Sequence, residues 1–419
     1  MSDLLQRVTE IARTAKKASR ALALAPTAVR DAALRAAAQA LRADEAAILE
    51  ANVKDLAAAK AKGLTDAMTD RLRLDHARLE DIAVACEAVA KLPDPVGEVT
   101  EDWTRPNGLR IIRRRVPIGL VAIIFESRPN VTVDAAALCL KSGNGCVLRG
   151  GSEAIHTNIA LSKSFATGLR AAGLPAEAVT LLPFTDREAV PALGSLRGIV
   201  DIIVPRGGPG LIEAVVNSAK VPVIKHDAGI CHVYVHAQAD LAMAEQIVLN
   251  AKCQRPSACN ALETLLVDAA VAEKFLPKMA AALAAKKTEV RACAQSRPLM
   301  PGAKAATEQD FRTEHLGLIL NVKIVAGLAE AVAHVEDYGS HHSDAIITAD
   351  ESAARAFLAQ IDSACVYWNA STRFTDGGEF GFGAEVGIST DRLHARGPMG
   401  IRELTTWKFE IVGQGQVRG

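Results

Sequence analysis

From Gly119 onward, short apolar runs alternate with segments that follow a helical pattern. The apolar runs include LVAIIF at 120–125, HVYVH at 232–236 and DAIIT at 344–348, and the helical segments between them include 153–172, 209–219, 241–252, 328–337 and 350–361. This alternation is typical of βαβ units that build parallel sheets. It therefore predicts an α/β fold, and 419 residues are enough for two or three domains.

The first 95 residues are rich in alanine and follow a helical pattern. Apolar residues recur at close to helical spacing after Pro26, and Gly63 is a typical helix stop. A second helical stretch is predicted over 64–90, before Pro93. Asn107-Gly108 then predicts a β-hairpin. Two interpretations of this basic hairpin remain open: a solvated surface element, and a protrusion that packs on a second subunit.

The 48 basic residues balance the 48 acidic residues, which argues against nucleic acid or an anionic membrane as the main partner. No run approaches the roughly 18 uncharged residues of a transmembrane helix. The N-terminus lacks the apolar core of a secretory signal, and Asp3 and Glu10 argue against a transit peptide. These features predict a cytoplasmic protein.

Eight cysteines without a C-x-x-C pair suit neither a disulfide scaffold nor a zinc site. His226, Cys231, His232 and His236 lie close in sequence, but no further ligand follows at a suitable spacing. We therefore predict no metal.

Two glycine-rich turns follow predicted strands and precede predicted helices. Residues 143–154 carry Arg149 at the end of one strand, and residues 200–216 carry Gly207 and Gly208 before Pro209. Free backbone N–H groups at such helix starts suit a phosphate or a ribose. Neither turn has the G-x-G-x-x-G pattern, so an ordinary βα loop remains the alternative for each.

Cys259 lies in a polar turn between a predicted helix and a predicted strand. A nucleophilic thiolate needs such an exposed, electropositive place, and Arg255 is nearby in sequence. Simple packing of the thiol, or a redox pair with Cys253, are the alternatives. The Gly-rich segment 369–400 mixes arginines with glutamates and suits either a small charged substrate or a subunit contact.

Five segments, at 116–154, 254–264, 314–320, 338–348 and 369–400, resemble the gamma-glutamyl phosphate reductases, or glutamate-5-semialdehyde dehydrogenases, within the aldehyde dehydrogenase superfamily. The resemblance runs in order from about residue 10 to residue 412. It implies an aldehyde dehydrogenase-like α/β fold with a Rossmann-type cofactor domain (1–100 and 117–228), an α/β catalytic domain (229–400) and a small oligomerisation β-element (101–116 and 401–419).

The resemblance also implies the chemistry. Cys259 takes the position of the nucleophile, the cofactor is NADPH, and the reaction reduces L-glutamyl 5-phosphate to L-glutamate 5-semialdehyde in proline biosynthesis. The implied cofactor-binding residues come from both glycine-rich turns and a later loop: Arg149, Ser152, Glu153, Gly207, Gly208 and Glu314. A homo-oligomer (dimer or tetramer) and an association with the upstream glutamate kinase are the expected partners.

Two departures from the superfamily pattern bear on mechanism. Glu126 stands where oxidising members carry an asparagine that holds the oxyanion, and Asn130 is the alternative donor. Residues 225–229 lack the glutamate that activates water in those enzymes, although His226 or Asp227 are alternative holders of a water. A missing base suits an acyl-phosphate reductase, because water would waste its thioester intermediate.

The substrate carries two anionic groups and one ammonium. Arginines suit the anions because the guanidinium pairs with them bidentately. We assign Arg128, Arg373 and Arg396 to the anions, Glu126 or Glu385 to the ammonium, and Ser389 and Thr390 to further polar contacts. Two rival functions remain: a hydrolytic or CoA-acylating aldehyde dehydrogenase, and a non-catalytic scaffold dimer.

Overall fold

A parallel sheet in the order β5-β4-β3-β6 forms the centre of the first unit in the computed structural model, which describes residues 3–225 and 228–418. Its strands are β3 (Leu120–Phe125), β4 (Gly145–Arg149), β5 (Val179–Leu181) and β6 (Ile202–Arg206). Alternate residues of β3 enter two different cores: Val121, Ile123 and Phe125 on one face, and Leu120, Ala122 and Ile124 on the other. The strand is apolar throughout because helices cover both faces.

Some of those helices precede β3 in the sequence and the others follow it. The N-terminal ones are α1 (Asp3–Leu24), α2 (Thr27–Ala43), α3 (Glu45–Ala61), α4 (Asp66–Leu72) and α5 (His76–Lys91), and the later ones are α6 (Val131–Lys141), α7 (Ile155–Ala171), α8 (Ala189–Gly194) and α9 (Pro209–Ser218). Helices α2, α5, α6 and α7 pack on one face of the sheet, and α1 and α8 pack on the other.

The single helical stretch predicted over 64–90 is wrong, because it is divided into α4 and α5. Asp75 caps α5 by accepting a hydrogen bond from the Arg78 backbone N–H at 2.9 Å. The buried Asn52 side chain holds the break, donating to the Leu72 carbonyl and accepting from the Leu74 N–H, each at 2.9 Å. Asn52 lies far from this break in sequence, so the helical pattern alone does not reveal it.

The second unit is built on a seven-stranded sheet in the order β10-β9-β11-β8-β7-β12-β13. All of its pairings are parallel. Its strands are β7 (Cys231–Val235), β8 (Leu262–Asp268), β9 (Glu289–Ala292), β10 (Lys304–Ala305), β11 (Ile319–Val325), β12 (Ser343–Ile347) and β13 (Cys365–Trp368), and its helices are α10 (Leu241–Cys253), α11 (Ala269–Ala285), α12 (Glu308–Phe311), α13 (Leu328–Tyr338) and α14 (Glu351–Gln360). The prediction of an α/β fold with parallel sheets is therefore confirmed.

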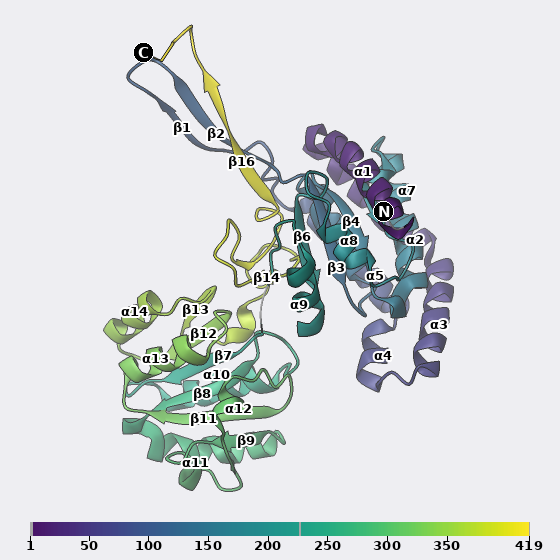
Figure 1. The fold of residues 1–419 in the computed structure, drawn as a ribbon. Coiled ribbons are helices and arrows are strands. Elements are labelled where there is room, and N and C mark those ends of the chain that lie inside the picture. The colour runs from purple at the N-terminus through teal and green to yellow at the C-terminus, as the bar shows by residue number, and fades with distance from the viewer. Residues whose placement is uncertain (1–2, 226–227, 419) are drawn as a thin grey trace.

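A third, antiparallel sheet projects from the two units and carries the C-terminal end of the chain (Figure 1). The hairpin of β1 (Val99–Thr104) and β2 (Arg110–Pro117) turns at Asn107-Gly108, where Gly108 has a φ of 86°. The hairpin prediction is thus confirmed. Strand β16 (Thr405–Val412) pairs along the whole of β2, which joins the hairpin and the C-terminal segment into one element.

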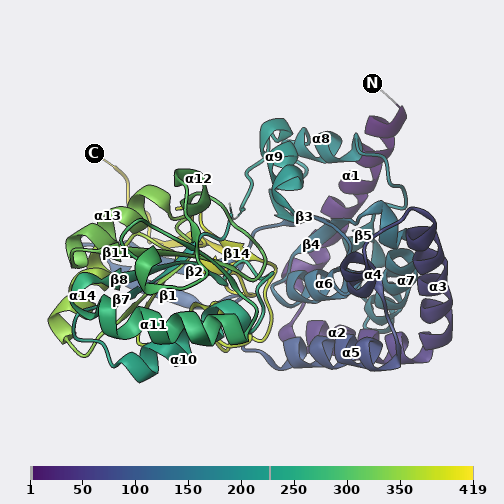
Figure 2. The ribbon, with the colours of Figure 1, turned by 90° about the horizontal axis from the view of Figure 1, so that it is seen from below.

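The two α/β units lie side by side, and segment 369–400 lies between them (Figures 1 and 2). This segment contains only short elements, including the two-residue strands β14 (Ile388–Ser389) and β15 (Gly397–Pro398). The short apolar run VPVI at 221–224 forms only a single bridge, at Val223. Within the described residues, no helix combines the length and apolar character that a membrane span requires.

Candidate active site

A cavity of about 620 Å³ opens between the two α/β units. The first unit contributes the ends of β3 and β6 with the start of α9, and the second contributes the turn before β8 and the loop before β11. Segment 369–400 closes a further side. The cavity gathers eight of the residues predicted for function: Glu126, Arg128, Gly207, Gly208, Cys259, Glu314, Arg373 and Glu385.

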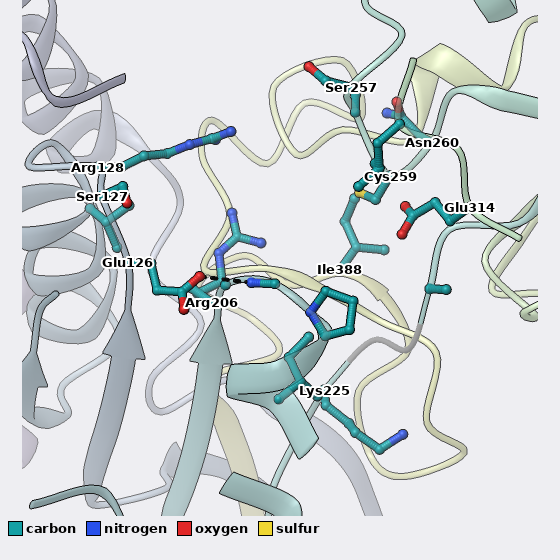
Figure 3. Close-up of a pocket in the computed structure, with 18 of the residues that line it drawn as sticks. Glu126, Ser127, Arg128, Arg206, Lys225, Ser257, Cys259, Asn260, Glu314 and Ile388 are labelled. Atoms are coloured by element: carbon teal, nitrogen blue, oxygen red, sulfur yellow. Dashed lines mark hydrogen bonds between the residues drawn. The ribbon is translucent and has the colours of Figure 1, made fainter. Parts of the chain in front are cut away.

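Cys259 lies in the turn between α10 and β8, as the sequence predicts, and its side chain is half-buried at the cavity wall (Figure 3). The turn is anchored on both sides. The Asn260 side chain donates to the Thr375 carbonyl at 2.8 Å, and the Cys231 thiol donates to the Cys259 carbonyl at 3.3 Å. All eight cysteines are free thiols. The sulfur of Cys259 is therefore held at the cavity.

Burial and nearby charged groups shift the pKa of the Cys259 thiol in opposite directions. Burial raises the pKa of the Cys259 thiol to about 11, Arg206 opposes this increase, and Glu314 and Glu385 add to it. A thiolate is disfavoured in a low-dielectric place unless a positive charge faces it. In the free protein the thiol is thus protonated at neutral pH, and its activation depends on the balance of nearby charges.

Gly229 brings the Cys259 turn unusually close to the chain that precedes β7. A Cβ at position 229 would lie 1.9 Å from the Cys259 carbonyl oxygen and 2.8 Å from its Cα. The Gly229 backbone also donates a hydrogen bond that opposes the increase in the Glu314 pKa caused by burial. One glycine therefore contacts two of the residues predicted for catalysis and cofactor binding.

Glu314 and Glu385 reach the cavity from different segments of the second unit. Burial is the main cause of the raised pKa of each carboxyl. Glu385 accepts a hydrogen bond from the Gly377 N–H at 2.9 Å, which fixes its orientation within segment 369–400. Both carboxyls can approach a substrate or cofactor group in the cavity.

On the opposite wall, Gly207 and Gly208 precede α9. The Gly208 N–H donates to the Glu126 carboxylate at 2.9 Å (Figure 3). A negative group at this helix start is favoured by the free N–H groups and by the helix dipole. The Glu126 carboxylate thus occupies the anion-binding position at the start of α9.

Three predicted cofactor residues are not among those that line the cavity: Arg149, Ser152 and Glu153. The buried Arg149 donates to the Thr185 carbonyl at 3.0 Å. Glu153 accepts from both the N–H and the hydroxyl of Ser127 at 2.7 Å, and Ser152 is exposed beside it. Ser127 lines the cavity, so Glu153 contacts one of the cavity residues directly.

Asn130 also does not line the cavity. Its amide donates to the half-buried Asp134 carboxyl at 2.7 Å, within the first turns of α6. The pKa of Asp134 is raised to about 6, chiefly by burial, although Asn130 and Arg206 oppose the shift. In this arrangement Asn130 stabilises Asp134 and does not face the sulfur.

Asp134→Asn should stabilise the protein above pH 6. The folded-state pKa of about 6 lies above the usual unfolded value near 4, so this group's contribution to stability falls as pH rises between those values. The variant should remove a cost of about 3 kcal/mol, since each pKa unit corresponds to about 1.4 kcal/mol. Thermal unfolding at pH 5 and pH 8 would test it: the variant's advantage should be larger at pH 8, and an equal difference at both would contradict the explanation.

Three further predicted substrate residues lie outside the cavity lining: Ser389, Thr390 and Arg396. Arg396 forms an ion pair with Asp362 at 2.7 Å and also donates to the Asp362 carbonyl. Ser389 is fully buried, and the Thr390 N–H donates to the Lys225 carbonyl at 3.2 Å. The alternatives His226 and Asp227 lie outside the described residues.

The prediction missed five cavity residues that carry charge, namely Arg71, Arg206, Glu213, Lys225 and Asp376, and it considered Arg255 only as a neighbour of Cys259. Arg71 comes from α4 in the first unit, and Arg206 ends β6. A usable signal existed for Arg206, which directly precedes Gly207-Gly208 at a strand end. Arg71 carries no such signal, since only the packing of α4 brings it to the cavity.

The sequence matches the model of the aldehyde dehydrogenase family over residues 5–294. It is 54% identical to the gamma-glutamyl phosphate reductase of Moorella thermoacetica, an alignment that covers 96% of this chain and 97% of that protein. The enzyme of the same name from Caulobacter vibrioides is also 54% identical, with 97% and 98% covered. The chain belongs to the gamma-glutamyl phosphate reductases of the aldehyde dehydrogenase family.

Solved structures agree with this membership. The crystal structure of gamma-glutamyl phosphate reductase from Thermotoga maritima matches with a TM-score of 0.96 at 45% identity, with 100% of both chains covered. More distant members share the fold alone: glyceraldehyde-3-phosphate dehydrogenase GapN from Methanocaldococcus jannaschii, solved in complex with NADP, matches with a TM-score of 0.69 at 18% identity over 98% of this chain and 95% of that chain. The predicted aldehyde dehydrogenase-like fold is confirmed, and the fold of this family binds NAD(P).

Proposed function

We propose that this protein reduces L-glutamyl 5-phosphate to L-glutamate 5-semialdehyde and phosphate with NADPH, as a step of proline biosynthesis. The observation that carries the proposal is the position of Cys259, which faces a cavity with arginines on both sides: Arg128 and Arg206 from the first unit, and Arg373 from the second. A small substrate with two anionic ends fits between them. The sequence relatives of this chain carry the name of that activity.

The cofactor side of the cavity fits a dinucleotide. A Cβ at Gly208 would have only Glu126 within 4 Å, at 3.9 Å, so a phosphate that displaces the Glu126 carboxylate can approach this backbone closely. Among the described residues, the buried Nε of Arg149 has no partner. Burial is the main cause of the lowered pKa of Arg149; Glu153 opposes this shift and Arg187 adds to it. The two neighbouring arginines suit a 2′-phosphate, which supports NADPH over NADH. Bound NADPH supplies the hydride that reduces the acyl group.

In the proposed mechanism the Cys259 thiolate attacks the acyl carbon of the substrate. A bond forms between sulfur and carbon, the bond from carbon to the phosphate oxygen breaks, and phosphate leaves with the electron pair. The backbone N–H groups of the Cys259 turn are the nearest candidates to hold the oxyanion, since Asn130 is committed to Asp134. Reduction of the thioester gives a thiohemiacetal, whose collapse releases the aldehyde and restores the thiolate.

The proposal requires that no general base activates water to attack the thioester. Lys225, Ala228 and Gly229 provide no carboxylate, while His226 and Asp227 lie outside the described residues. A positioned general base contributes about a hundredfold or more to such a hydrolysis. Where no side chain activates water, a thioester survives long enough to exchange with phosphate.

The assayable reverse reaction tests the function. With L-glutamate 5-semialdehyde and NADP⁺, the purified protein should reduce NADP⁺ quickly in the presence of inorganic phosphate and about a hundredfold more slowly without it. Initial rates of absorbance change at 0 and at saturating phosphate measure the ratio. Equal rates would instead indicate a hydrolytic aldehyde dehydrogenase, and a requirement for CoA would indicate an acylating one.

We also propose that the projecting sheet mediates self-association. Trp407, Phe409 and Ile411 alternate along β16 and so share one face, where they are 40%, 51% and 60% exposed. Exposed apolar residues gathered in this way on a protruding sheet are typical of a subunit contact. Dimer or tetramer size, contact with glutamate kinase and a cytoplasmic location remain predictions.

Ile411→Asp should weaken this self-association and increase the fraction of monomer, because it places a charge in an apolar interface. Light scattering coupled to size exclusion measures the mass. Val417→Asp is the matched control, because Val417 is 90% exposed and lies beyond the sheet. If both variants keep the mass of the unchanged protein, the projecting sheet is not the contact.

A further inference from the structure

Arg206 is the last residue of β6, and its backbone is fixed by the sheet. It pairs with Phe125 of β3, and its carbonyl accepts from the Glu126 N–H at 3.2 Å. Its side chain extends from the strand end into the cavity, on the side that faces the Cys259 turn (Figure 3). The strand therefore aims one cation of the first unit at the nucleophile of the second.

Segment 369–400 makes room for this side chain. A Cβ at Gly387 would lie 3.3 Å from both the Cδ and the Nη1 of Arg206, so the arginine passes directly over the glycine backbone. Such a contact is tighter than most real Cβ contacts and would shift the arginine side chain by a few tenths of an ångström. The absence of a side chain at 387 keeps Arg206 in its position.

The guanidinium of Arg206 is not committed to a protein carboxylate. Within residues 3–225 and 228–418, no ion pair or hydrogen bond joins its side chain to another residue. The two carboxylates that share the cavity wall have other donors, since Glu126 accepts from the Gly208 N–H and Glu385 from the Gly377 N–H. Glu385 and Asp134 lie close enough for Arg206 to oppose the rise in their pKa values, but neither is hydrogen-bonded to its side chain. The guanidinium is therefore available to a negative group that forms during reaction.

The other arginines near the sulfur interact with neighbouring residues. Arg373 donates to the Gln254 side chain at 2.9 Å and also to the Asn260 side chain, so its guanidinium helps hold the turn. Burial is the main cause of the lowered pKa of Arg128, and Arg71, Arg206 and Arg255 add to it, so this group of cations suits an anionic end of the substrate. Of the cations, Arg206 acts most strongly on Cys259, against the effect of Glu314 and Glu385.

We propose that Arg206 is a further catalytic residue of this site, whose guanidinium stabilises first the Cys259 thiolate and then the phosphate that leaves. The second part of the proposal rests on the proposed function. The thiol proton goes to solvent, the sulfur electron pair forms the bond to carbon, and the electron pair of the broken carbon–oxygen bond leaves with phosphate. Negative charge thus passes from sulfur to phosphate while one fixed cation faces both.

The first test needs no substrate. Alkylation of Cys259 by iodoacetamide is followed by mass spectrometry of its peptide from pH 6 to pH 10, in unchanged protein and in Arg206→Gln, Arg206→Lys and Arg170→Gln. Arg206→Gln should raise the thiol pKa and slow alkylation about tenfold at pH 8, the effect of one pKa unit. Arg206→Lys should restore most of the rate. Arg170 is exposed at the end of α7, outside the cavity lining, so Arg170→Gln should alkylate like the unchanged protein.

A second variant keeps the test informative if Arg206→Gln folds poorly. Gly387→Ala retains the arginine but displaces its guanidinium, and should slow alkylation in the same direction by a smaller factor. The charged neighbours Arg128, Glu314, Arg373 and Glu385 are unchanged in both variants. An unaltered pH profile in folded Arg206→Gln and in Gly387→Ala would overturn the role at the thiolate.

The phosphate part is tested by the concentration of inorganic phosphate that half-saturates NADP⁺ reduction by the semialdehyde. Arg206→Gln should raise this concentration at least about tenfold, and Arg206→Lys should raise it less. An unchanged value in Arg206→Gln would overturn the role at phosphate. If the unchanged protein shows no dependence on phosphate, the proposed function fails, whereas the alkylation result still decides the role of Arg206 at the thiolate.

Discussion

Cys259→Ala is expected to lower phosphate-dependent NADP⁺ reduction by L-glutamate 5-semialdehyde at least about a thousandfold, because no other group can form the thioester. Alanine removes the sulfur and leaves the anchors of the turn, which come from the Asn260 side chain and the Cys259 carbonyl. Calorimetric titration should therefore show NADPH binding close to that of the unchanged protein. Initial rates measured at saturating phosphate provide the comparison.

Cys253→Ala is the matched control for the nucleophile. Cys253 ends α10, is half-buried and has its sulfur 3.5 Å from the Thr288 hydroxyl, outside the cavity lining. Its removal should leave the rate unchanged within about twofold. Loss of activity in both variants would instead support a redox pair of Cys253 and Cys259, and retained turnover in Cys259→Ala would refute the nucleophile.

Gly229→Ala is expected to lower the same activity by about a hundredfold, although the substitution adds one methyl group. The new Cβ would stand 1.9 Å from the Cys259 carbonyl oxygen, so the turn that carries the sulfur has to move by more than an ångström. Misplacement of a reacting group on that scale costs roughly a hundredfold in rate. The hydrogen bond from Gly229 to Glu314 would be disturbed at the same time.

The rate of Cys259 alkylation, measured together with the melting temperature, separates displacement of the sulfur from general unfolding. In folded Gly229→Ala the alkylation rate should change in either direction as the exposure of the sulfur changes. Gly210→Ala is the steric control, because a Cβ there would have no neighbour within 4 Å, and its alkylation should match the unchanged protein. Normal turnover and alkylation in Gly229→Ala would contradict the close approach of Gly229 to the Cys259 turn.

Local patterns in the sequence predicted much of this molecule. The uniformly apolar β3, the Asn107-Gly108 hairpin and the polar turn at Cys259 each depend on residues that are neighbours along the chain. The same holds for Gly207-Gly208, where a strand end and a helix start adjoin. In each case the preference of a short segment and its place in the fold agree.

What could not be predicted depends on partners that are distant in sequence. Asn130 and Arg396 are polar residues in suitable segments, yet their side chains are committed to Asp134 and Asp362. Arg71 reaches the cavity only because α4 packs against other helices of the first unit, and Gly229 matters only because it lies against the Cys259 turn. Each of these facts is a tertiary contact, which a pattern along the chain does not encode.

The carboxylate of Glu126 on the Gly208 N–H has a consequence for ligand binding. A nucleotide phosphate that reaches the first turn of α9 has to replace that carboxylate, so binding there is an exchange of one anion for another. The net charge near the start of α9 then changes less than it would if the phosphate bound without displacing the carboxylate. Once displaced, the Glu126 side chain is free to turn toward the substrate side of the cavity. A bound nucleotide would then add the negative charge of Glu126 to the surface that contacts the substrate.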